Sequence, residues 1–127
     1  MRVPQALYVV AVCAFLVSML SAQDAVKADP THYTIMSENE NVRILKVHYG
    51  PHEKSVMHSH PATTAIFLTD GNAMFTFPDG KTQTLTPKAG EAVYTDAMTH
   101  LPENTGDQAF DVVLVELKVK VKPTKKQ

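Results

Sequence analysis

Two histidines, His58 and His60, lie two positions apart and are the first candidates for chemistry in this chain. Because side chains alternate between the faces of a β-strand, both imidazoles would point the same way on a strand. Two imidazoles on one face can bind one metal ion. Thr64 and Ile66 have the same parity, so an uninterrupted strand would place them on the same interior face. A pair of exposed loop histidines is the alternative, because the spacing alone is weak evidence.

A third histidine, His100, follows about 40 residues after the pair. In a closed barrel a later strand lies beside an earlier one, so His100 is a candidate partner of His58 and His60. Three imidazoles would occupy one face of a metal ion and leave positions open for water or substrate. The sequence therefore predicts His58, His60 and His100 as the ligands of one metal ion.

The elements that must position these histidines are short strands separated by turns. Apolar and β-branched runs indicate strands at residues 33–36, 41–49, 63–69, 73–77, 81–85, 92–95 and 109–121. Turn residues recur about every 8–12 positions, for example DGN at 70–72 and PDG at 78–80. No segment after residue 22 has a convincing helical period, so we expect an all-β sandwich or barrel. The polar residues 23–40 predict a loosely held arm that contains the strand at 33–36.

The histidines and the glycines around them resemble the two motifs of a small single-domain cupin of the cupin-2 type. The first motif runs from Gly50 through His58 and His60 to Gly71, with a segment before His58 that is two residues longer than the family form. The second runs from Gly80 through Pro87, Gly90 and His100 to Asn104; its His-x3-Asn end matches directly and its earlier spacing is looser. The resemblance covers about residues 41–118. It implies a double-stranded β-helix, the cupin jelly-roll barrel, with a cupin domain at 41–121 and a tail at 122–127.

One departure from the family motif concerns the acidic ligand. In the family form three or four residues separate the second histidine from a glutamate, and Thr64 stands at the first of the two corresponding positions, 64 and 65. The hydroxyl of Thr64 is expected to bind water or substrate rather than metal. Several iron dioxygenases among the cupins resemble this pattern, with three histidines and no glutamate. The resemblance implies one divalent ion, iron, manganese, nickel or zinc, and the alternative is a cupin pocket without metal. A second departure is that residues 95–99, before His100, lack the proline and glycine found there in many relatives.

The N-terminal residues predict export. Arg2 precedes a run without charge at residues 6–20, and the small residues Ser21 and Ala22 come before a polar stretch. This pattern is typical of a signal peptide over residues 1–22, and an uncleaved anchor is the alternative. Cys13 lies inside it, so a secreted or periplasmic mature domain would have no thiol. No membrane partner is expected after cleavage.

Charge argues against nucleic acid as a partner. The chain has a net charge of −1, and without Arg2 it has 11 basic and 13 acidic residues, a net charge of −2. The only basic stripe is at residues 118–126, where valine and lysine alternate first, which predicts an edge strand with a solvated lysine face and a loose tail. A nucleic-acid-binding domain would need a more extended basic surface.

The remaining candidate residues give weaker evidence of a functional site. His32, His48 and His52 are expected at the surface, and Glu53, Glu91 and Glu103 lack the spacing of the missing acidic ligand. The aromatic residues Phe67, Phe75, Phe77 and Tyr94 are expected in the core rather than as substrate clamps. Met57, Met74 and Met98 are expected as core or pocket residues. The candidate substrate-binding residues are Thr64, Ile66, Tyr94 and Met98.

Three functions are open at this point. The first is a metal-dependent, dioxygenase-like enzyme that acts on a small organic substrate. The second is a non-enzymatic periplasmic module that binds a sugar, a metabolite or the metal itself. The third is a metal-assisted isomerase or lyase. A homodimer is possible, in which residues 23–39 pair across an interface.

Overall fold

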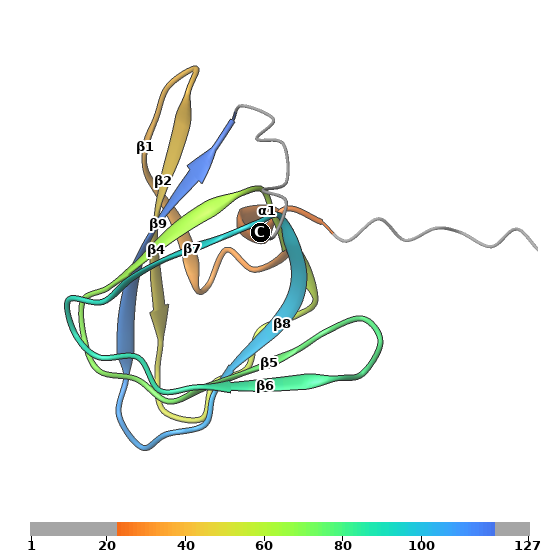
Figure 1. Cartoon of the computed structure of the whole chain (residues 1–127), viewed down its shortest axis with the longest axis vertical. Coiled ribbons are helices and arrows are strands. Elements are labelled where there is room, and N and C mark those ends of the chain that lie inside the picture. Colours follow the sequence, from red (N-terminus) through yellow and green to blue (C-terminus); the bar gives the residue numbers. More distant parts are fainter. Residues whose placement is uncertain (1–22, 119–127) are drawn as a thin grey trace, which may run out of the picture.

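A computed structural model describes residues 23–118, which form two antiparallel β-sheets on opposite sides of one interior (Figure 1). The expected signal segment with Cys13, the last residues of the expected final strand, 119–121, and the tail at 122–127 lie outside the described residues. Within 23–118 the elements are α1 Ala25–Ala28, β1 Tyr33–Glu38, β2 Val42–Tyr49, β3 His58–His60, β4 Thr63–Phe67, β5 Ala73–Thr76, β6 Thr82–Leu85, β7 Ala92–Thr95, β8 Met98–Asn104 and β9 Phe110–Leu117.

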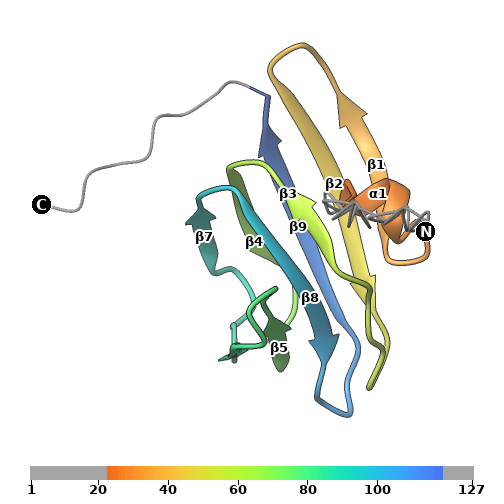
Figure 2. The same cartoon turned by 90° about the vertical axis from the view of Figure 1, so that its right-hand side faces the viewer.

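The strands are arranged as a jelly roll. One sheet has the order β1-β2-β9-β4-β7 and the other the order β3-β8-β5-β6. Figure 2 shows β3 and β8 in front of β4 and β9, so the two sheets face each other across the interior. The expected all-β class is confirmed. Among the described residues, no helix is long and apolar enough to cross a membrane.

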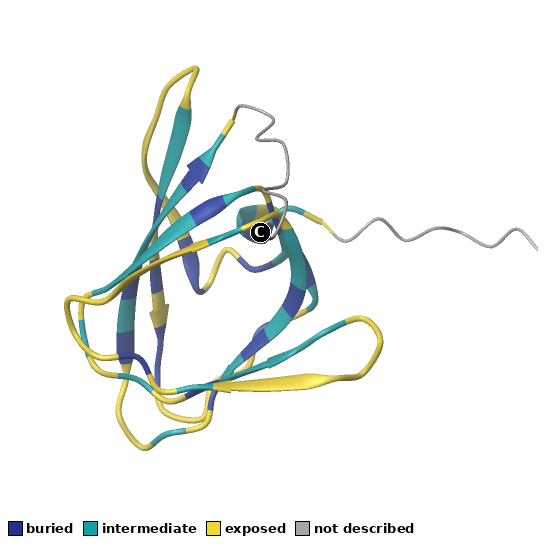
Figure 3. Ribbon diagram, viewed as in Figure 1, coloured by how far each residue is buried: buried dark blue, intermediate teal, exposed yellow. Residues whose placement is uncertain are grey.

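The registers of the central strands build the interior. Leu45 pairs with Leu114, Val47 with Val112 and Tyr49 with Phe110, so alternate residues of β2 and β9 share one face. Leu45, Val47, Tyr49, Phe110 and Val112 are buried members of the core cluster. Figure 3 shows the buried residues within the strands, whereas the turns and most of β6 are exposed. The core therefore forms between the sheets, because every second residue of these strands points to the interior.

Two strands differ from the expected pattern. Pro61 and Ala62 separate β3 from β4, and the two strands belong to different sheets. An uninterrupted strand from His58 to Leu68 is therefore wrong. The strand β8, which carries His100, was not predicted. Its sequence, MTHLPEN, contains a proline and four polar residues, which weaken the usual strand signal.

The N-terminal residues are part of the domain rather than a loose arm. Helix α1 begins after Asp24, whose side chain accepts from the backbone of Lys27 as an N-cap, and Ala25 is fully buried. The expected strand at 33–36 is confirmed as β1, which pairs with β2. The expectation of a loosely held segment is wrong because Ala25 and Tyr33 bury apolar surface in the core.

The final strand lies in the middle of its sheet. β9 pairs with β2 on one side and with β4 on the other. Its run of valines and leucines suits a strand with a partner on each edge. The lysine-rich residues expected to form an edge strand begin at Lys118, where β9 has ended, and residues 119–121 lie outside the described range.

Candidate metal centre

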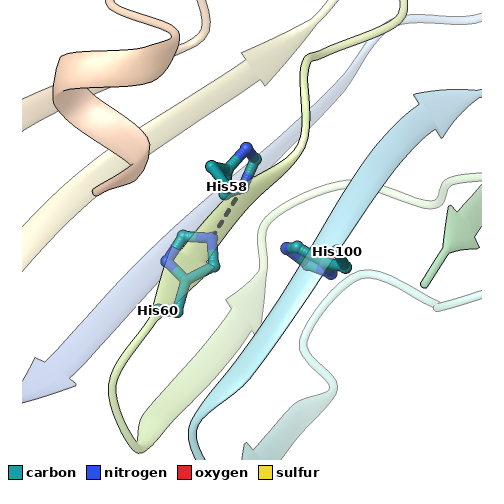
Figure 4. A group of neighbouring side chains, drawn as sticks. All are labelled: His58, His60 and His100. Carbon is teal, nitrogen blue, oxygen red and sulfur yellow. Dashed lines mark hydrogen bonds between the residues drawn. The ribbon is translucent and has the colours of Figure 1, made fainter. Parts of the chain in front are cut away.

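The three predicted ligands are brought together by the pairing of β3 with β8. His58 is the register partner of His100, and His60 follows two positions later on the same face of β3. Directly opposed residues on antiparallel strands hold their Cβ atoms about 4.5–5.5 Å apart, which suits imidazoles that share one ion. Figure 4 shows the three rings directed toward one another. All three side chains are buried, so the predicted histidine cluster is present.

The rings have the mutual arrangement of ligands on one face of an ion. Their centroids lie 4.8 Å apart for His58 and His60, 5.0 Å for His58 and His100, and 5.2 Å for His60 and His100. Each pair of ring planes meets at 86° or 87°. One nitrogen of each ring lies within 4.8 Å of the corresponding nitrogens of the others.

Hydrogen bonds on the outer side of two rings fix which nitrogen faces inward. Nδ1 of His58 lies 2.8 Å from the carbonyl oxygen of Val56, and Nδ1 of His60 lies 2.8 Å from Oε1 of Glu116. A carbonyl and a carboxylate can only accept, so each Nδ1 carries the proton and each neutral ring has its lone pair on Nε2. These two Nε2 atoms lie 3.0 Å apart, a contact that Figure 4 marks as a dashed line. Two lone pairs at this distance repel unless a proton or a metal ion lies between them.

The third ring, His100, has no hydrogen-bond partner for Nδ1 or Nε2 among the described residues, although both atoms are buried. An unpaired buried polar group costs about 1–3 kcal/mol. A metal ion would satisfy one of these nitrogens. Two nitrogen ligands at about 2.1 Å from one ion and at right angles lie about 3.0 Å apart, as the Nε2 atoms of His58 and His60 do. The residues present therefore fit a divalent ion that prefers nitrogen ligands.

Burial keeps two of the ligands neutral. Burial and the proximity of His60 lower the pKa of His58 to about 4. Burial, with His60 and His58 as neighbours, lowers the pKa of His100 to about 3. Both rings are therefore unprotonated at neutral pH and have lone pairs available for a metal.

Glu116 is a functional residue that the sequence reasoning missed. Its side chain is only 2% exposed, and it lies between His60 and the guanidinium of Arg43, whose Nε donates to Oε2 at 2.7 Å. In the register of β2 and β9, Arg43 and Glu116 are direct partners. The available signal was the position of Glu116, which has the parity of the core residues Phe110 and Val112, whereas Asp111, the other carboxylate of β9, does not.

The N-terminal segment also contacts the centre. The ring of Tyr33 packs edge-on against His58, at 4.9 Å between centroids, and at a tilt against His60, at 5.6 Å. The hydroxyls of Tyr33 and Tyr49 are 2.8 Å apart, and burial raises the pKa of Tyr33 well above its usual value. Tyr33 therefore stays neutral, packs against His58 and His60, and also lines the cavity that adjoins them.

The expected surface position of His32 is wrong. Its ring is buried, stacks on Tyr49 with centroids 4.3 Å apart, and contacts Asp29 at 2.6 Å and Glu53 at 2.5 Å. Burial opposes protonation, but the two carboxylates outweigh it and raise the pKa of His32. The other two, His48 and His52, are exposed as expected and pair with Asp111 and Asp107.

A cavity of about 280 Å³ adjoins the histidines, and His60 and His100 form part of its wall. The interior residues of β4 are Thr63, Ala65 and Phe67. Thr64 and Ile66 are not among the lining residues, because the break at residues 61–62 reverses the parity of β4 relative to β3. The prediction that Thr64 and Ile66 face the interior is therefore wrong.

The other two candidate substrate-binding residues differ in position. Met98 lines the cavity. Tyr94 does not; it is 47% exposed, and its neighbours Val93 and Thr95 line the cavity instead. Among the predicted core aromatics, Phe67 and Phe75 line the cavity. The exposed residues Glu91 and Val93 also line the cavity, whereas Glu53 and Glu103 are not among its lining residues.

Two residues of the family motifs have structural roles. The buried side chain of Asn104 donates from Nδ2 to the carbonyl oxygens of Gly50, at 3.0 Å, and Gln108, at 2.8 Å. Its Oδ1 accepts from the backbone of Gly106 at 2.9 Å. A Cβ at Gly50 would require the carboxylate of Glu53 to shift. These contacts fix the turns at one end of the barrel.

Comparisons with known proteins place this geometry in a family. The family model described as "Cupin domain" matches residues 45–116. A cupin domain from Bordetella pertussis has a TM-score of 0.64 at 22% identity, over 68% of this chain and 92% of its own. A conserved protein with a double-stranded β-helix domain from Klebsiella pneumoniae has a TM-score of 0.55 at 23% identity, over 67% of this chain and 74% of its own. A cupin superfamily protein from Desulfitobacterium hafniense has a TM-score of 0.51 at 18% identity, over 67% of this chain and 74% of its own. No curated protein matches the chain.

Proposed function

The chain belongs to the cupin domain family, and from this premise we propose that it binds one divalent metal ion for chemistry on a small, largely apolar molecule. His58, His60 and His100 would be the ligands. The observation that carries the proposal is the pair of Nε2 atoms of His58 and His60, 3.0 Å apart, beside a His100 ring whose nitrogens have no partner among the described residues. A divalent ion resolves both features at once.

Three neutral ligands leave the charge of the ion uncompensated and leave coordination positions open. A bound ion would supply Lewis-acid activation or, for iron, reaction with dioxygen. Iron, manganese, nickel and zinc all bind imidazole nitrogen. The ligands therefore do not identify the ion, and its identity has to be measured. The histidines would contribute a facial set, in which outer hydrogen bonds of Nδ1 keep the inward nitrogens of His58 and His60 unprotonated and burial lowers the pKa of His100.

The walls of the cavity indicate the kind of molecule that would bind. Their apolar side chains include Ala65, Phe67, Phe75, Met98 and Leu114. These side chains bind apolar surface and exclude water from the metal positions. The cavity of about 280 Å³ limits the substrate to a small molecule. A substrate with an apolar body and one oxygen donor for the metal fits this arrangement best.

The groups around the cavity favour an oxygenase over an isomerase or lyase. An isomerase or lyase needs a base close to the substrate. Among the described lining residues the only carboxylate is Glu91, which is exposed. An oxygenase places less demand on protein bases because the metal and dioxygen carry the reaction.

The first test is the metal content of the full-length protein purified without added ions. We expect about one equivalent of a divalent metal in the wild type and in the control His48→Ala, and a loss in His58→Ala. Oxygen uptake with small aromatic or aliphatic candidates then distinguishes an oxygenase from a binding module. If the wild type retains none of the four metals and His58→Ala changes nothing, the proposal fails.

We also propose that the protein is exported, because residues 1–22 have the composition of a signal peptide. Fractionation of the native host, followed by N-terminal sequencing, tests this. We expect the mature chain outside the cytoplasm, beginning near Gln23. An intact N-terminus in the cytoplasmic fraction would contradict export.

A further inference from the structure

Residues 23–33, which we call the N-terminal brace, precede the part of the chain that the family model matches, 45–116. They nevertheless contact the outer side of the histidine cluster. We propose that the N-terminal brace is a positioning part of the metal centre, in which Asp24 orients His60 through Arg43 and Glu116, and Asp29 supports His58 through Ser55. The inference rests on the proposed function, because it assigns these residues to the same metal site.

The brace is attached to the backbone between two ligands. β3 lies at the edge of its sheet, and its middle residue, Ser59, donates from its backbone to the carbonyl oxygen of Gln23 at 2.9 Å. Asp24 and Ser59 also form an isolated parallel bridge. A three-residue edge strand has few hydrogen bonds of its own, so this contact restrains the spacing of His58 and His60.

The connection through Asp24 consists of three side-chain contacts. Asp24 pairs with the guanidinium of Arg43, and Nη1 of Arg43 lies 3.3 Å from Oδ2 of Asp24. Arg43 also donates from Nε to Oε2 of Glu116 at 2.7 Å, and its Nη2 lies 2.6 Å from the same oxygen as part of the ion pair. Glu116 in turn accepts from Nδ1 of His60 at 2.8 Å. The planar guanidinium has a fixed set of donors, so its position determines the orientation of the Glu116 carboxylate.

Charge gives this connection a second effect. Two carboxylates share one guanidinium, so the Asp24–Arg43–Glu116 group has a net negative charge. This charge lies behind His60, on the side of the ring opposite to the inward nitrogen, and favours a cation bound at that nitrogen. Without Asp24, Arg43 would neutralise Glu116 more completely, and His60 would be a weaker ligand. The N-terminal brace therefore contributes negative charge to a site whose ligands are all neutral.

The connection through Asp29 is shorter and looser. The Ser55 hydroxyl donates to Oδ2 of Asp29 at 2.5 Å, and the same oxygen of Ser55 lies 3.4 Å from Nδ1 of His58. The main acceptor for that nitrogen is the carbonyl of Val56, so Asp29 has a smaller share in orienting His58. We therefore expect a larger effect from Asp24 than from Asp29.

The first experiment uses Co²⁺ binding to the full-length protein, measured by visible absorption. We expect Asp24→Asn to weaken binding about 10-fold, and Glu116→Gln about 10- to 100-fold, the range for partners behind a metal ligand. Asparagine preserves the N-cap of α1, so the fold is retained. Asp24→Asn should have little further effect in Glu116→Gln, because both act through one connection. Asp24→Glu should recover part of the affinity, and Asp107→Asn, which removes an exposed carboxylate, should bind as the wild type does.

The second experiment does not depend on metal. In the metal-free protein, ¹⁵N NMR of the histidine rings reports the Nδ1–H of His60 and its hydrogen bond. We expect Asp24→Asn to shift the His60 signals and Asp29→Asn to shift those of His58, with Asp107→Asn changing neither. The inference is overturned if Asp24→Asn leaves the His60 signals unchanged, or if its effect on Co²⁺ affinity adds fully to that of Glu116→Gln. If the wild type binds no Co²⁺, the proposed function fails, and the ring signals still decide whether the brace orients the histidines.

Discussion

Glu116 accepts a hydrogen bond from Nδ1 of His60 at 2.8 Å, while Nε2 of the same ring lies 3.0 Å from Nε2 of His58. The carboxylate is therefore one imidazole away from the position that an ion would occupy. The family motif has a glutamate as a direct ligand, and Thr64 stands at the first of its two possible positions. In this chain the buried carboxylate of Glu116 would instead act on a bound ion through the His60 ring, which would leave one more coordination position open.

The unpaired ring of His100 predicts a conflict between stability and metal binding. Replacing it in His100→Leu removes two buried nitrogens that have no partner in the described part of the chain. It also removes the edge-on contact with Phe75, at 4.3 Å between centroids. The balance of these effects should raise the free energy of unfolding of the metal-free protein by about 1 kcal/mol and eliminate metal binding.

Thermal or urea unfolding with EDTA, and Co²⁺ titration, measure the two effects. His48→Leu, at an exposed position of β2, is the control and should change stability by less than about 0.5 kcal/mol. A metal-free His100→Leu protein that is clearly less stable than the wild type would show that the His100 nitrogens have partners.

The lowered pKa values of His58 and His100 predict how stability depends on pH. The unfolded chain takes up protons on these residues near their usual pKa of about 6.5. The folded chain takes them up only near pH 4 for His58 and pH 3 for His100. Between pH 6.5 and 5 the unfolded state therefore binds more protons, and the metal-free protein should lose stability as the pH falls.

These two histidines can contribute a slope of up to about 2.7 kcal/mol per pH unit, which corresponds to two protons. His32 acts in the opposite direction because its pKa is raised. Unfolding of the metal-free wild type and of His100→Leu in buffers from pH 5 to 8 measures the slope. His100→Leu should have a smaller slope, and an equal slope would show that His100 is protonated normally in the folded protein.

The sequence predicted the histidine cluster better than it predicted the lining of the cavity. The His-x-His spacing and the later His100 were sufficient for the cluster because the pairing of β3 with β8 makes His58 and His100 partners. The face of Thr64 was predicted wrongly because Pro61 and Ala62 end one strand and begin another in the opposite sheet. Parity cannot be carried across such a break.

Long-range contacts explain the other differences. Glu116 is 56 residues away from His60, and its role depends on the register of β9 with β2 and β4. His32 looked like part of a polar arm because its partners, Glu53 and the ring of Tyr49, are distant in sequence. Local composition shows a charged or polar side chain but not the partner that allows its burial.

The buried position of His32 predicts a pH-dependent contribution to stability. His32→Phe retains an aromatic ring to stack on Tyr49 but removes the hydrogen bonds to Asp29 and Glu53. We expect a loss of about 1–3 kcal/mol. The charged form of His32 stabilises the fold fully below its unfolded pKa of about 6.5, and this contribution is lost as the pH rises through the raised folded pKa.

The difference between wild type and His32→Phe should therefore be larger at pH 6 than at pH 9. Chemical unfolding at the two pH values measures it, with the exposed His48→Phe as the matched control. A difference that grows toward pH 9 would mean that His32 is buried in its neutral form.

The reversed parity of β4 predicts where an acidic ligand can be restored. The family spacing allows three or four residues between the second histidine and the glutamate, which corresponds to position 64 or 65. Ala65 lines the cavity beside His60 and His100, whereas Thr64 is not a lining residue. Ala65→Glu places a carboxylate in an apolar cavity. This should destabilise the metal-free protein, and a bound divalent ion should offset the cost.

The measurement is the shift in unfolding temperature on addition of Co²⁺ or Zn²⁺. Ala65→Glu should show a larger metal-dependent shift than the wild type, because the new carboxylate is available to the ion. Thr64→Glu, with the same added charge on the outer face of β4, should shift as the wild type does. A larger shift for Thr64→Glu than for Ala65→Glu would show that position 64 faces the metal and that the break between β3 and β4 does not reverse the strand.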